Sequence, residues 1–276
     1  MTGTLLALGS AATYGVADLA GGLLSRRVGF AAVALLGQVG GLVLSVGVAL
    51  AVPSTVTLVD LGWGALSGVG TGAGMAFLYR GLSRGAMSVV VPVSAVGGVA
   101  LPVLVGVILL GDRPSGLAWV GIVVAVPALW LVSWTGSSAR ADVVSGVPDA
   151  LLASMGIAVQ YLALAQAGPD AGIWPVVAGR VAAVLALAPV VARRARESIS
   201  AAHVGLAAAI GGMAALALSL YLLATRQQMV VVAVVLSSLY PVIPVVFGMT
   251  ALRERLCRTQ VAGLLGAGAA TVLLSL

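Results

Sequence analysis

Long apolar runs follow one another along almost the whole chain and limit what it can fold into. A helix that crosses about 30 Å of hydrocarbon needs about 20 apolar residues. The segments between the runs are too short to fold into a soluble domain. The sequence therefore predicts an all-α polytopic membrane protein with ten transmembrane helices, at about residues 3–24, 30–51, 59–79, 86–110, 115–134, 148–167, 172–191, 203–223, 229–250 and 259–276.

The composition agrees with a membrane environment. Hydrophobic residues make up 61% of the chain and charged residues 8%, which leaves too little polar surface to cover a water-soluble globule. Transmembrane strands are a poor alternative, because the runs are about twice as long as a barrel strand needs and do not alternate. No basic residue precedes the first run, so we interpret it as a retained helix. We expect a multi-pass protein of the bacterial cytoplasmic membrane.

The chain also repeats itself at an offset of 142 residues, without a gap over the matching stretch. At this offset Tyr79, Arg84, Met87, Pro102, Arg113 and Gly121 fall on Tyr221, Arg226, Met229, Pro244, Arg255 and Gly263. Five runs lie in each of two predicted repeats, residues 1–135 and 147–276. Because five crossings turn the second half over, the sequence predicts the inverted repeat typical of secondary transporters.

An acid stands beside a base at the end of the fourth run and again at the end of the ninth. These pairs are Asp112-Arg113 in "VGVILLGDRPSG" and Glu254-Arg255 in "MTALRERLCRTQ". A charge at the membrane interface avoids the cost of insertion at mid-bilayer. We therefore interpret both pairs as helix ends, in preference to a direct contact with substrate.

The residues around these pairs follow a common pattern, Gly-Glu-x-x-Ser/Thr-x-x-Gln-x-x-Gly after a proline-bearing helix. It is represented by Gly111-Asp112-Arg113-Pro114-Ser115 with Gly121, and by Glu254, Gln260 and Gly263. The copies depart from it at Asp112, Ala118 and Arg253. With this pattern and the pair Tyr14-Gly15, the whole chain resembles a ten-helix member of the drug/metabolite transporter superfamily, of the EamA type. The resemblance implies transport of small organic solutes such as amino acids, other metabolites or drugs, often outward.

Polar residues inside the apolar runs are the candidate substrate-binding or coupling residues, because hydrocarbon penalises them unless they face a partner or a wet cavity. They are Asp18, Gln38, Gln160 and Arg180. The offset of 142 residues relates Asp18 to Gln160 and Gln38 to Arg180, so we expect the four at matching depths, where such transporters bind substrate. The cavity could also be lined by Tyr14, Tyr79, Tyr161, Tyr221 and Tyr240.

Two interpretations of Asp18 and Arg180 stay open. They could bind the two ends of a zwitterion or take part in proton coupling, which favours amino-acid-like solutes over a hydrophobic cation, the alternative substrate. Otherwise the two side chains merely pair with each other and hold helices together.

Glycine and proline indicate close packing and bends. Gly64, Gly68 and Gly72 form a stripe at four-residue spacing, with Gly70 and Gly74 beside it, which predicts close approach of helix backbones. Kinks are expected at Pro92, Pro102, Pro241 and Pro244.

Other classes of function fit less well. The single Cys257 and single His203 exclude an ordinary metal site, and one histidine with two glutamates leaves little for an enzyme. We expect no cofactor. No ATP-binding loop is present, so coupling must come from a proton gradient or from exchange. A channel or a non-transporting scaffold would not explain the inverted repeat.

The expected partners are a small-molecule substrate and the lipid bilayer, not nucleic acid, and a homodimer is left open.

Arginine is distributed unevenly between the two sides of the predicted bundle. One side has only Arg113 and Arg226, whereas the other has Arg26, Arg27, Arg80, Arg84, Arg140, Arg193, Arg194, Arg196, Arg253, Arg255 and Arg258. Arginine-rich short loops stay in the cytoplasm, which puts both termini outside. The family resemblance implies both termini inside.

Overall fold

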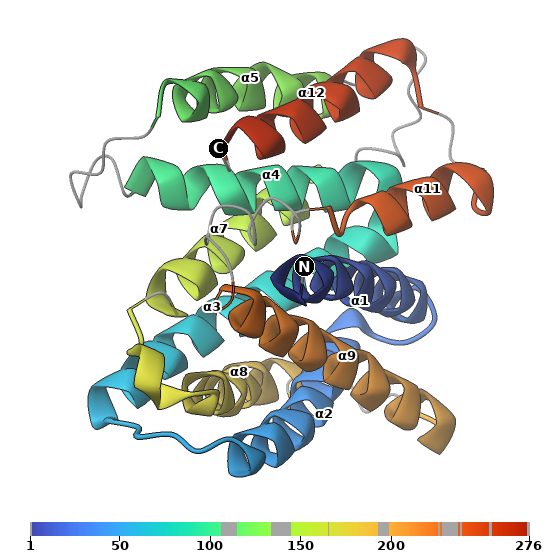
Figure 1. The fold of residues 1–276 in the computed structure, drawn as a ribbon. Coiled ribbons are helices and arrows are strands. Elements are labelled where there is room, and N and C mark those ends of the chain that lie inside the picture. Colours follow the sequence, from blue (N-terminus) through green and yellow to red (C-terminus); the bar gives the residue numbers. More distant parts are fainter. Residues whose placement is uncertain are drawn as a thin grey trace.

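The fold of the described residues is entirely helical in a computed structural model (Figure 1). The structure describes residues 2–105, 115–133, 145–164, 166–192, 199–225, 227, 237, 239–253 and 256–274, and no strand occurs among them. The α-helices are α1 (Thr2–Ser25), α2 (Phe30–Ala51), α3 (Leu58–Arg84), α4 (Met87–Val105), α5 (Gly116–Ser133), α7 (Val147–Leu164), α8 (Trp174–Ala192), α9 (Ala201–Thr225), α11 (Val242–Thr250) and α12 (Arg258–Leu274), with a 3-10 turn at Pro169–Ala171. The predicted all-α class is confirmed, and each predicted run overlaps one of these helices.

Four described helices, α2, α7, α8 and α9, are long and apolar enough to cross a membrane by length and composition. Large apolar side chains also point outward, and Leu58, Leu50 and Leu265 are 86%, 73% and 72% exposed. Water-soluble monomers rarely expose wide apolar surfaces, so the chain has the character of a membrane protein. The helix α3 falls outside this group because its many glycines make it less apolar. Ten membrane crossings stay a prediction.

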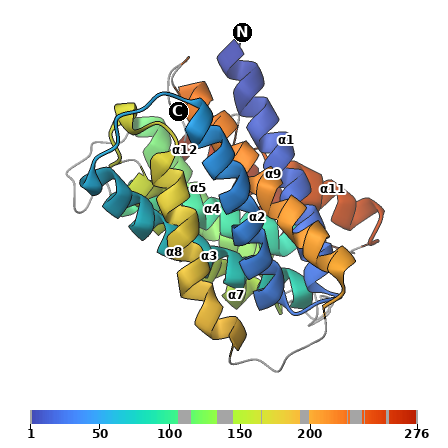
Figure 2. The ribbon, with the colours of Figure 1, turned by 90° about the horizontal axis from the view of Figure 1, so that it is seen from below.

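The helices pack in pairs that match the sequence repeat. α3 packs along α7 and α8, and α9 packs along α1 and α2; Figure 2 shows α9 between α1 and α2. The offset of 142 residues relates α1, α2 and α3 to α7, α8 and α9. The contacts of α3 with α7 and α8 are therefore equivalent to the contacts of α9 with α1 and α2. Two further contacts, α2 with α8 and α5 with α12, join equivalent helices of the two halves. α5 and α12 lie beside α4, away from α2, α8 and α9 (Figure 1).

The predicted close approach at the glycine stripe is confirmed. A Cβ added at Gly64, Gly68 or Gly72 would meet the backbone of α8, at Pro175, Gly179 and Ala183 in turn. The neighbouring Gly70 and Gly74 face the backbone of α7 around Gly156. Missing side chains thus let α3 lie directly against two helices of the second half, as in small-residue packing between membrane helices.

The predicted bends at proline stay untested, although the prolines lie where a bend would act. Pro92 and Pro102 fall within α4, Pro244 is buried in α11, and Pro241 is the residue that precedes α11. Loss of a backbone donor at these positions weakens the helix there.

Polar contacts join the halves at both ends of α3. At its C-terminal end, Arg80 Nε donates to Asp149 Oδ1 of α7 at 2.8 Å, and the Arg80 guanidinium lies 4.8 Å from the centre of the Phe77 ring. At its N-terminal end, Asp60 accepts hydrogen bonds from the Thr57 backbone at 2.9 Å and from Gly168 N at 2.7 Å. α3 is therefore fixed to α7 at its C-terminal end and to the segment that follows α7 at its N-terminal end.

We expect the Arg80–Asp149 ion pair to contribute more to the free energy of unfolding than the neighbouring contact of Arg84 with Asp149. Asp149 is buried, and Asp149→Ala removes the acceptor of two Arg80 donors, which costs about 2 kcal/mol of unfolding free energy. Arg84 Nη1 lies 3.8 Å from Asp149 and its side chain is 60% exposed, so Arg84→Ala should cost less than about 1 kcal/mol. Chemical unfolding in detergent measures the loss of unfolding free energy in each variant. Equal losses in the two variants would contradict this assignment.

Candidate functional site

A buried hydrogen bond joins two positions that the sequence repeat relates to each other. Arg180 Nη1 of α8 donates to Gln38 Oε1 of α2 at 2.7 Å, across a separation of 142 residues. Both side chains are buried. Gly41, almost one turn beyond Gln38, makes room for the guanidinium, because an added Cβ there would lie 3.2 Å from Arg180 Cζ and Nε. Equivalent residues can touch only where the two halves meet, so this contact marks one place where the two halves meet.

Asp18 lies inside α1 and does not pair with Arg180. Its residue is 6% exposed, and the ion pairs of the described residues instead involve Asp149. The interpretation of Asp18 and Arg180 as an ion pair that holds helices together is therefore wrong. The physical reason is that the hydrogen-bond acceptor of Arg180 is Gln38 on α2, and not Asp18 on α1.

Gln160, the counterpart of Asp18, takes part through its backbone. Its carbonyl oxygen accepts a hydrogen bond from Ser67 Oγ of α3 at 2.9 Å, and its side chain is half-buried in α7. The structure thus places Gln160 at the contact between α3 and α7, where Gly70 also packs against its backbone nitrogen.

The tyrosines predicted to line a cavity contact one another in pairs or lie against α1. The rings of Tyr14 and Tyr240 are 6.2 Å apart, and those of Tyr161 and Tyr221 are 6.4 Å apart in an edge-on arrangement. The buried Tyr79 ring lies against Gly21 of α1. The electrostatic interactions of Asp18 reach four tyrosines: Tyr14, Tyr79, Tyr161 and Tyr240. Those of Arg180 reach Tyr14 and Tyr79. These interactions link Asp18 and Arg180 with tyrosines of both halves, while the role of these residues in binding stays a prediction.

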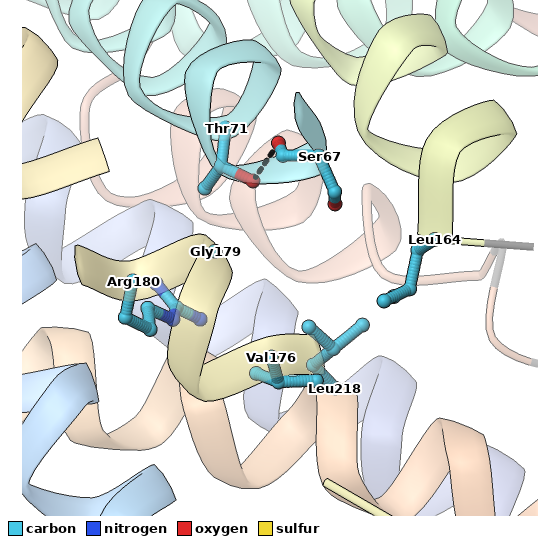
Figure 3. A pocket seen from close by; sticks show the side chains of 7 residues that line it. All are labelled: Ser67, Thr71, Leu164, Val176, Gly179, Arg180 and Leu218. Carbon is cyan, nitrogen blue, oxygen red and sulfur yellow. Dashed lines mark hydrogen bonds between the residues drawn. The ribbon is translucent and has the colours of Figure 1, made fainter. Parts of the chain in front are cut away.

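A small pocket opens beside Arg180 (Figure 3). It is lined by Ser67, Thr71, Leu164, Val176, Gly179, Arg180 and Leu218. It has room for about one water molecule, so a larger solute would enter only after helices separate. Ser67 and Thr71 were not among the residues predicted from the sequence. Their spacing of four residues, beside the glycine stripe, was the available signal for a polar patch on the buried face of α3.

Several predicted residues cannot be placed. Asp112, Arg113, Arg226, Glu254 and Arg255 lie outside the described residues, so the two acid–base helix ends have no structural account. In the described part of the chain, no three His, Cys, Asp or Glu side chains gather as metal ligands would. His203 contacts Ser200 Oγ through Nδ1 at 2.9 Å near the start of α9.

Comparison with known proteins finds a similar fold but no family. The sequence matches no family model and no curated protein. A solved structure described only as "Crystal structure of protein" has a TM-score of 0.62 and 18% sequence identity, and the similarity covers 100% of this chain and 99% of that one. At this identity the likeness concerns the fold alone. The helical arrangement therefore has an experimental counterpart over its full length.

Proposed function

We propose that the protein is a secondary transporter that moves small organic solutes across the bacterial cytoplasmic membrane by alternating access. The observation that carries the proposal is the buried Arg180–Gln38 hydrogen bond, because it joins repeat-related positions at the meeting of the two halves. Secondary transporters with inverted repeats bind solutes at this place. Asp18 and the tyrosines lie in the same region and come from helices of both halves.

The helix contacts give the proposal a mechanism. α3 and α9 each pack on two helices of the opposite half, and small residues keep the packed surfaces of α3 and α8 smooth. Such halves could rock against each other around a fixed centre. The resemblance to EamA-type transporters favours export, and coupling would come from a proton gradient or from exchange. In that scheme Asp18 and Arg180 serve solute binding or proton coupling.

Other functions have less support. A non-transporting scaffold needs no buried polar cluster shared by two repeats, and a channel needs a continuous polar path, whereas the described pocket holds about one water molecule. An enzyme would need a constellation of reactive groups near one interface, which the sequence does not offer.

Counterflow in liposomes tests the proposal. Purified protein is reconstituted with a high internal concentration of one solute from a panel of amino acids, other metabolites and organic cations, and uptake of a labelled trace of the same solute is followed. A carrier concentrates the trace transiently inside. The reason is that a binding site that has carried unlabelled solute outward picks up labelled solute before it turns inward again. A channel lets the trace equilibrate without this overshoot, and a scaffold moves nothing.

We predict that both termini face the outside of the cell. Eleven of the 14 arginines lie on the opposite side of the predicted bundle, and arginine-rich short loops are retained in the cytoplasm. A reporter that fluoresces only in the cytoplasm, fused after Leu276, should be dark, while alkaline phosphatase at the same position should be active. A bright fusion would reverse the assignment and agree with the family resemblance.

A further inference from the structure

Asp18 is a buried acid with no partner among the described residues. It is 6% exposed, and no hydrogen bond or ion pair of the described part of the chain reaches its carboxylate. Among the described residues, the acid that pairs with arginine is Asp149. The buried guanidinium of Arg180 donates to Gln38 instead. A carboxylate in such a place is costly until a positive charge or a proton neutralises it.

Four tyrosines, on three helices and a connecting segment, lie within electrostatic reach of this carboxylate. Tyr14 lies four residues before Asp18, on the same face of α1, and its ring pairs with Tyr240, the second residue before α11. Gly21, three residues after Asp18, brings the Tyr79 ring of α3 against α1. Tyr161 of α7 is also within electrostatic reach of Asp18. We name Tyr14, Tyr79, Tyr161 and Tyr240 the tyrosine cage.

The chemistry of this cage suits a cation that carries apolar groups. The face of an aromatic ring is negative and attracts ammonium groups, best where water is excluded. Asp18 supplies the full negative charge, and the rings contact the methyl or alkyl groups around the nitrogen. A zwitterion would need a second, positive group for its own carboxylate, and the tyrosines supply none; the buried Arg180 already donates one hydrogen bond, to Gln38.

We infer that Asp18 and the tyrosine cage bind an organic cation, an alkylated or quaternary ammonium, as the solute of the protein. This inference rests on the proposed transport function and names its substrate class, in place of the amino-acid-like solutes that the sequence favoured. Entry of the cation requires the rings to separate, which the movement of α1 against α3 and α7 would allow.

The inference is tested by measuring how tightly three compounds of similar shape bind to the purified full-length protein in detergent. The probe is benzyltrimethylammonium. Its uncharged isostere is neopentylbenzene, and the zwitterion is phenylalanine. We expect the cation to bind at least about tenfold more tightly than either of the others, because only the cation gains the ion pair and the ring contacts. Equal binding of the isostere, tighter binding of phenylalanine, or no binding of the cation would overturn the inference.

Matched variants locate the site. Asp18→Asn should weaken binding of the cation at least about tenfold, while Asp170→Asn, which removes an exposed acid from the turn at Pro169–Ala171, should leave it unchanged. Tyr161→Phe keeps the ring and the affinity, and Tyr161→Leu loses affinity. The Tyr161 variants decide the matter if Asp18→Asn does not fold. Wild-type affinity in Asp18→Asn or in Tyr161→Leu would contradict the site.

Counterflow separates the failure of this inference from the failure of the proposed function. Counterflow of another solute without cation binding would keep the transporter and reject the cation site. Cation binding that depends on Asp18, without counterflow of any solute, would keep the site and reject the transporter.

Discussion

Gly68→Ala should destabilise the protein strongly, by about 3 kcal/mol of unfolding free energy or more. A Cβ at this position would overlap the carbonyl of Gly179, and because the obstacle is backbone, no side-chain rotation can relieve it. α3 and α8 would have to move apart along their whole contact. A lower thermal midpoint in detergent, and a smaller fraction of monodisperse protein, measure the effect.

Gly62→Ala on the same helix is the control. An added Cβ at Gly62 meets nothing within 4 Å, and the residue is exposed. Both substitutions change helix propensity in the same direction, by up to about 1 kcal/mol in favour of alanine, so their difference isolates the packing of α3 against α8. Equal midpoints for the two variants would show that this helix contact does not limit stability.

Gln38 and Arg180 should show strong coupling in a double-mutant cycle. Gln38→Leu leaves a buried guanidinium without its acceptor, which costs about 3 kcal/mol. Arg180→Met leaves the Gln38 amide unsatisfied, which costs about 2 kcal/mol. Replacing both partners with apolar residues should be close to neutral. Additive losses in the double variant would contradict the contact.

The same double variant separates a structural role from a role in transport. If Arg180 and Gln38 serve only to hold α8 against α2, the stable double variant transports at the wild-type rate. The proposed function expects the double variant to fold and to lose counterflow. Asp18→Asn belongs to the same test, because wild-type transport by Asp18→Asn and by Arg180→Gln would remove both residues from the site.

The helices were predictable because crossing a membrane sets a minimum apolar length. All ten predicted runs overlap a described helix, and α2, for example, has the predicted bounds. The contact of α3 with α8 was also within reach of the sequence, since a stripe of glycines at four-residue spacing has few uses except close packing. Which helix would lie there, however, depends on the arrangement of the whole bundle.

Side-chain partners were less predictable, because they depend on which helices meet. A pairing of Arg180 with Asp18 was one of two interpretations of the sequence, and Arg180 bonds to Gln38 because α8 packs on α2. Arg80 was treated as one of many arginines at helix ends, and its ion pair with Asp149 requires α3 and α7 to be antiparallel neighbours. The clustering of the tyrosines was suggested only by their number and by the repeat that links Tyr79 with Tyr221.

Cysteine accessibility tests the central claim, alternating access, most directly. Thr71 lines the pocket beside Arg180, so Thr71→Cys in a Cys257→Ser background gives a single reporter thiol inside the bundle. An impermeant maleimide is applied to right-side-out and inside-out vesicles while the proton or solute gradient is reversed. The account predicts that the thiol is labelled mainly from one side at a time, and that the side changes with the gradient. Labelling from both sides under one fixed gradient, or from neither side under any gradient, would contradict it.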